Sequence, residues 1–95
     1  MLKLQETGLE EFSFGDEAAD TFFILVNKKI SPKGINVEKL RLADPRNFDA
    51  VLNEMGCIIM LNGIEVEELV RRGELQKENL HKSMYELAIN EGLLN

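Results

Sequence analysis

Cys57 and His81 are the only cysteine and the only histidine of the chain. A thiolate beside an imidazole would provide the nucleophile and the base of covalent catalysis. Cys57, however, begins the apolar run 57–61, where a thiol behaves as a small, unreactive hydrophobic group. We expect His81 to be exposed on a helix, and no third residue stands out as the group that would orient it. The sequence therefore predicts no catalytic pair.

Glu65, Glu67 and Glu68 are candidate oxygen ligands for a hard cation. They lack the alternating Asp and Asn residues and the central glycine of a calcium loop. One cysteine and one histidine are also too few for a structural zinc site. Acidic residues at the start of a helix interact favourably with its dipole, which explains the three glutamates without a metal. We predict no metal site and no cofactor.

Seventeen acidic residues leave room for a carboxylate pair that performs acid/base catalysis. Such an enzyme also needs aromatic side chains to hold its substrate, and five Phe, one Tyr and no Trp must serve the core as well. No glycine-rich phosphate loop occurs. We therefore predict a protein that is not an enzyme, with a small carboxylate-using enzyme as an alternative.

Residues 15–25, which run from Gly15 through Asp20 and Thr21 to Leu25, resemble a stretch of the cyclic-nucleotide-binding β-roll. In that family a glycine, a glutamate and an arginine further along the chain bind the phosphate. These three residues have no counterpart here, and 95 residues are too few for the complete roll. The local resemblance accordingly predicts no nucleotide site.

Length and composition indicate one small domain over residues 1–95. The chain is 44% hydrophobic and 29% charged, as in an ordinary globular protein, and it contains no repeat or linker. Its longest apolar runs, 22–26 and 57–61, are far shorter than the roughly 20 residues of a membrane span. The start of the chain lacks the pattern of a signal peptide. A single cysteine suits a reducing compartment, so we expect a cytoplasmic location without membrane attachment.

Charge is distributed unevenly along the chain, whose net charge is −6. Residues 1–27 carry a net charge of −5, residues 28–46 carry +4, and residues 47–95 carry −5. The basic segment either packs against its acidic neighbours or forms a binding patch for a partner. The candidate partner-binding residues are its six bases and two apolar residues of the C-terminal tail: Lys28, Lys29, Lys33, Lys39, Arg41, Arg46, Leu93 and Leu94.

These features favour a non-enzymatic protein–protein interaction module, such as a small phage- or bacterium-encoded accessory protein, inhibitor or assembly factor. We expect a protein partner or self-association. Nucleic acid is disfavoured because the chain is acidic and its basic segment has no interleaved aromatic residues for base stacking. The alternative from another class is an acidic mimic of nucleic acid that antagonises a DNA- or RNA-handling enzyme.

The expected fold class is α+β. Alternating apolar residues predict an N-terminal β-hairpin in which Leu2 and Leu4 face Phe14 and Phe12 across a turn at Thr7-Gly8. Residues 16–30 fit both a buried strand over 22–26 and an amphipathic helix, and the helix is favoured because acids precede and lysines follow it.

Later segments alternate between helices and one apolar run. Asn36 predicts the cap of a short helix from residue 37, although an extended segment over 35–42 fits almost as well. Asp44-Pro45 predicts the start of a helix that Gly56 ends. Residues 57–61 and 64–66 are expected to pair across a second hairpin at Asn62-Gly63. In the alternative, the preceding helix continues through Ile59 and ends at Asn62-Gly63.

The remainder is predicted to be helical over 67–72 and, after a break at Gly73, over 75–91 in a longer C-terminal helix. The predicted core consists of Leu4, Phe12, Phe14, Phe22, Phe23, Val26, Leu40, Phe48, Val51, Leu52, Ile58, Ile59, Val66, Leu69, Leu80, Met84 and Leu87.

Overall fold

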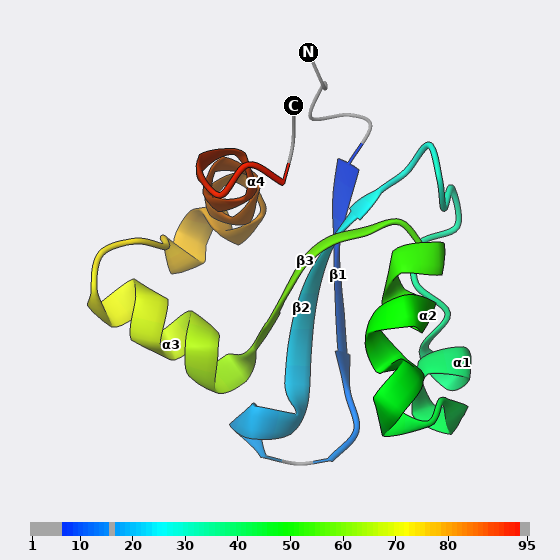
Figure 1. Cartoon of the computed structure of the whole chain (residues 1–95). Coiled ribbons are helices and arrows are strands. Elements are labelled where there is room, and N and C mark those ends of the chain that lie inside the picture. The colour runs from blue at the N-terminus through cyan, green and yellow to red at the C-terminus, as the bar shows by residue number, and fades with distance from the viewer. Residues whose placement is uncertain (1–6, 16, 94–95) are drawn as a thin grey trace.

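A three-stranded antiparallel sheet separates two pairs of helices in the computed structural model, which describes residues 7–15 and 17–93. Helices α1 and α2 lie on one side of the sheet, and α3 and α4 lie on the other (Figure 1). This arrangement confirms the α+β class. In chain order the elements are β1 (Thr7–Ser13), β2 (Thr21–Asn27), α1 (Val37–Leu42), α2 (Phe48–Glu54), β3 (Cys57–Asn62), α3 (Gly63–Arg71) and α4 (Leu80–Asn90).

The central strand β2 is buried on both faces. Ile24 and Val26 belong to the apolar cluster beneath α1 and α2, whereas Leu25 belongs to the cluster beneath α3 and α4. All three side chains are fully buried. The helix predicted over 16–30 is therefore wrong, and the buried strand is the correct alternative. A strand with one solvent-exposed face shows alternating apolar and polar residues. β2 is buried on both faces, so its sequence lacks the alternation that would have identified it as a strand.

The N-terminal hairpin exists, but its strands are β1 and β2. Phe12 lies opposite Phe22, and Thr7 lies opposite Asn27. Thr7 and Gly8 are thus strand residues rather than the predicted turn, and residues 14–20 connect the strands instead. Leu2 and Leu4 lie outside the described residues.

Three local predictions around α1 and α2 are confirmed. The Asn36 side chain accepts a hydrogen bond from the Lys39 backbone N–H and caps α1. The Asp44 side chain likewise accepts from the Arg46 N–H, although the first turn after Pro45 is a 3-10 helix (Pro45–Asn47) that precedes α2. Gly56 adopts a left-handed φ of +77° after the helix.

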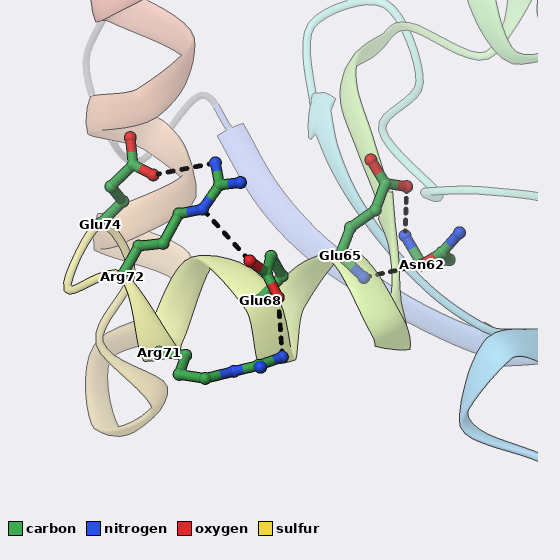
Figure 2. Close-up of polar contacts among 6 residues, drawn as sticks. All are labelled: Asn62, Glu65, Glu68, Arg71, Arg72 and Glu74. Carbon is green, nitrogen blue, oxygen red and sulfur yellow. Dashed lines mark hydrogen bonds and ion pairs between the residues drawn. The ribbon is translucent and has the colours of Figure 1, made fainter.

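The second hairpin, predicted at Asn62-Gly63, is wrong. β3 does form, but Asn62 is the N-cap of α3, as Figure 2 shows. The Asn62 side chain accepts from the Glu65 backbone N–H at 2.8 Å, and the Glu65 carboxylate accepts from the Asn62 N–H at 3.2 Å. This reciprocal pair satisfies two N–H groups at the start of the helix. Residues 64–66 are consequently helical instead of forming a strand.

The C-terminal helix α4 is the longest described helix, at 11 residues, but it begins at Leu80 rather than at residue 75. The Ser83 hydroxyl accepts a hydrogen bond from the Gln76 N–H at 3.0 Å and holds the preceding loop against the helix. Met84 and Ala88 are fully buried, which confirms the predicted apolar stripe. None of the described helices combines the length and apolar character that a membrane span requires.

Candidate functional site

Cys57 and His81 lie on opposite sides of the sheet. Cys57 packs against the cluster beneath α1 and α2, whereas His81 belongs to α4 and is only half-buried, with Nε2 3.5 Å from the Thr7 hydroxyl. Burial, with a smaller contribution from Asp49, raises the pKa of the Cys57 thiol to about 11. The thiol is therefore protonated at neutral pH, and the geometry brings no imidazole to it.

Cys57 should react slowly in the folded protein. Its pKa of about 11, against an ordinary 9.0, lowers the thiolate fraction about 100-fold below pH 9. We expect iodoacetamide to modify the folded protein at least that much more slowly than the urea-unfolded chain, as followed by mass spectrometry. The unfolded thiol ionises first, so this group also lowers stability as pH rises from 9 toward 11. Equal rates in the two states would contradict this burial.

The three candidate metal ligands have other partners. Glu65 takes part in the cap of α3, Glu67 pairs with Lys77, and Glu68 lies between Arg71 and Arg72, with oxygens 2.7 and 3.2 Å from the two guanidinium groups (Figure 2). The Arg72 guanidinium also lies 3.9 Å from the Glu74 carboxylate. No group of acidic, histidine or cysteine side chains in the described residues is arranged to hold a metal ion.

The six bases of residues 28–46 are divided between the connection that follows β2 and the region of α1 and α2. Lys28, Lys29 and Lys33 follow β2 in the connection to α1, and Lys28 contacts Glu10 at 2.8 Å. Lys33 is exposed, and the backbone N–H of Lys29 donates to Asn27. The other three bases are also close to acids: Lys39 lies 3.5 Å from Glu54, Arg41 3.3 Å from Glu38, and Arg46 3.0 Å from Asp44.

Of the two leucines predicted to bind a partner, Leu93 is half exposed and lies against a shallow groove beside α4. Its backbone N–H donates to the Ala88 carbonyl at 2.9 Å, which fixes the end of the helix. Leu94 lies outside the described residues. The tail therefore contributes one described apolar side chain to the surface.

Four phenylalanines meet at one end of the sheet. Phe12 belongs to β1, and Phe14 follows the end of that strand two positions later, so the two side chains lie on the same face, where Phe22 lies opposite Phe12. Phe14 contacts the rings of Phe12, Phe22 and Phe48 at centroid distances of 5.1, 5.3 and 6.4 Å. Phe48 reaches this cluster because it is the first residue of α2, whose position follows from the turn at Asp44-Pro45.

Three of these rings, Phe14, Phe22 and Phe48, line an open groove of about 580 Å³, which we call the aromatic groove. Its volume lies within the range of about 300–1,000 Å³ that is typical of ligand sites. Arg41 is the charged residue in its wall. The Arg41 guanidinium donates to the Ser13 carbonyl at 3.0 Å and to Glu38 at 3.3 Å, so its position at the groove is fixed. The other main lining residues are Phe14, Phe22, Leu40, Pro45, Phe48 and Met60.

Phe14 is the groove residue that the sequence places wrongly. The sequence predicts a core position for it, yet 42% of it is exposed because it lies beyond the end of β1, where it lines the open groove. Phe14 is two positions from Phe12, and this spacing does predict that the two side chains lie on the same face of the sheet. The distant Phe48 joins only through tertiary packing, so the sequence carries no signal for the complete groove.

Comparison with known proteins identifies no relative: no protein-family model, no curated protein and no solved structure shows a significant match to this chain.

Proposed function

We propose that this chain is a non-enzymatic protein-interaction module whose aromatic groove binds an apolar segment of a partner protein. The observation that carries the proposal is the set of Phe14, Phe22 and Phe48 in one open groove with Arg41 in its wall. Phe and Arg are among the residue types that are enriched at protein interfaces. An open groove also suits an extended peptide segment better than a small molecule, because small-molecule sites usually enclose most of their ligand.

Charge near the groove favours acidic residues beside the apolar segment. A guanidinium has five N–H donors, and the contacts of Arg41 with Ser13 and Glu38 use two of them. Arg46 follows Pro45 of the groove wall, and its side chain is 89% exposed. Carboxylates that flank the bound segment can therefore form charge-assisted hydrogen bonds with these two arginines.

The residues predicted from the charge pattern contribute unequally to this proposal. Arg41 and Arg46 lie at or next to the groove, whereas Lys28, Lys29 and Lys33 belong to the connection that follows β2. A small accessory protein, inhibitor or assembly factor is the kind of protein in which we expect such a module. The chain has one cysteine and so cannot form an internal disulfide, which suits a reducing compartment. We therefore propose that the protein acts in the cytoplasm.

Two matched peptide libraries test the proposal. Both contain Phe, Leu and Trp at central positions, and they differ only in flanking residues, which are Asp and Glu in one and Lys and Arg in the other. We expect the acid-flanked library to yield binders by fluorescence anisotropy. Phe14→Ser should weaken their binding about tenfold or more, because it removes an exposed aromatic contact.

Ile89→Ser is the control, because Ile89 is also about half exposed but lies on α4, across the sheet from the groove. This variant should bind like the original protein. Equal binding by both libraries would contradict the role of the arginines. Binding that survives Phe14→Ser, or no binding at all, would contradict the groove itself.

A further inference from the structure

The outer edge of β3 is open. β3 lies at one side of the sheet and pairs with β2, and no other described strand lies beside it. In Figure 1 it crosses in front of the other strands, with helices to its left and right but none before it. The backbone N–H and C=O groups on this edge can pair with a further strand.

β3 also lacks two of the features that usually prevent such pairing, charged residues and proline. Its sequence, Cys-Ile-Ile-Met-Leu-Asn, contains no charged residue and no proline, whereas the opposite edge strand β1 carries Glu10 and Glu11. A bulge interrupts the register near Ile58, opposite the step from Leu25 to Val26. The bulge affects the beginning of the strand, so Ile59 to Asn62 remain regular.

Partly buried apolar side chains of β3 lie beside the open edge on both faces of the sheet. Ile58, Ile59 and Met60 are each only partly buried. One groove of about 440 Å³ lies between β3 and the helices α3 and α4, and another of about 350 Å³ lies between β3 and α2. Side chains of an added strand point alternately to the two faces, so they would meet Ile59 on one face and Met60 on the other, beside the charged residues that also line the two grooves.

We propose that a second copy of this chain adds its own β3 to this edge in antiparallel orientation, which makes a continuous six-stranded sheet. A twofold axis perpendicular to the sheet keeps each helical layer on its own side, so residues that face each other must point to the same face. Met60 points toward α1 and α2, while Ile59 and Leu61 point toward α3 and α4. Several registers satisfy this condition. The one with Met60 opposite Met60 of the second copy pairs residues 58–62, which is more of β3 than a register centred on Leu61 and includes less of the bulged start than one centred on Ile59.

A second copy fits this edge because the strand is its own complement. Twofold pairing places identical residues near each other, which is unfavourable for a charged strand and harmless for an uncharged one. The same contact covers β3 of both copies, so the assembly closes as a dimer instead of growing into a fibre. Met60 also lines the aromatic groove, so the two proposals are tested with different variants. Phe14 follows β1, the edge strand opposite β3, and its replacement tests peptide binding without changing the proposed dimer interface.

Charge pairing at Met60 provides the test. We expect sedimentation equilibrium to show a dimer for the original protein and a monomer for Met60→Lys and for Met60→Glu, since each variant places like charges opposite each other. Mixing the two variants should restore association, about tenfold tighter than for either variant alone. Leu42→Lys, at a site on α1 that is 84% exposed, should leave the dimer intact.

A second measurement does not depend on the variants folding. Amide hydrogen exchange of the original protein should show protection of residues 59–62 that increases with protein concentration. A protein that stays monomeric at high concentration would overturn the proposal. A dimer that the Met60 variants preserve, a mixture that does not associate, or protection confined to other segments would overturn it as well.

Discussion

Leu25→Ala should lower the free energy of unfolding by about 2–5 kcal/mol, because it removes a large side chain from the centre of the fold. Leu25 is fully buried, and its cluster joins β2 to β3, α3 and α4. With the sheet on one side and two helices on the other, the surroundings have little freedom to close the resulting cavity. Urea unfolding followed by circular dichroism measures the change.

Ile24→Ala is the companion variant on the other face. Ile24 is also fully buried, but it packs beneath α1 and α2. We expect a loss of similar size, since a central strand supports both layers. Ile89→Ala, on the exposed face of α4, should change stability by less than about 0.5 kcal/mol. A loss below about 1 kcal/mol at either core position would contradict burial of β2 on both faces.

Gly56→Ala should lower the free energy of unfolding by about 2 kcal/mol or more. Gly56 has a φ of +77°, a conformation that costs an alanine about 1–2 kcal/mol. An added Cβ would also lie 3.0 Å from Ile30 Cβ and 3.1 Å from the Asn27 carbonyl oxygen. Gly56 cannot move away freely, because its carbonyl accepts a hydrogen bond from the Asn27 N–H at 2.8 Å.

Gly73→Ala separates the two contributions. Gly73 has nearly the same φ, +79°, but a Cβ there would meet no atom within 4 Å. Its replacement should therefore cost only the conformational energy, about 1–2 kcal/mol. The difference between the two variants measures the crowding at Gly56. If thermal or urea unfolding shows that both variants lose the same free energy of unfolding, residues 27 and 30 do not crowd Gly56.

Features that depend on local capping residues are predicted well from the sequence, whereas features that depend on tertiary burial are not. Asn36, Asp44 and Gly56 act through hydrogen bonds or backbone angles within a few residues, so the sequence places α1 and α2 correctly. Asn62 shows the limit of such signals. Asn-Gly is typical both of a tight hairpin and of a helix start, and the helix forms because Glu65 completes the cap.

The central strand and the aromatic groove depend on contacts that are distant in sequence. Residues 16–30 satisfy a helical pattern by chance, and only the strands on either side reveal that both faces of β2 are buried. The charge pattern names Arg41 among the candidate binding residues, but it does not name the aromatic residues that line the groove beside Arg41. Phe14 and Phe48 are 34 positions apart and meet only after β1 and α2 have packed.

NMR titration of protein with ¹³C-labelled phenylalanine tests the aromatic groove most directly. On addition of the acid-flanked peptides, the ring signals of Phe14, Phe22 and Phe48 should shift, because these rings line the groove. Phe23, which packs on the opposite face beneath α3 and α4, should stay unchanged in the same spectra. Shifts at Phe23 without shifts at Phe14 and Phe48 would contradict the proposed site, and so would a spectrum that the peptides leave unaltered.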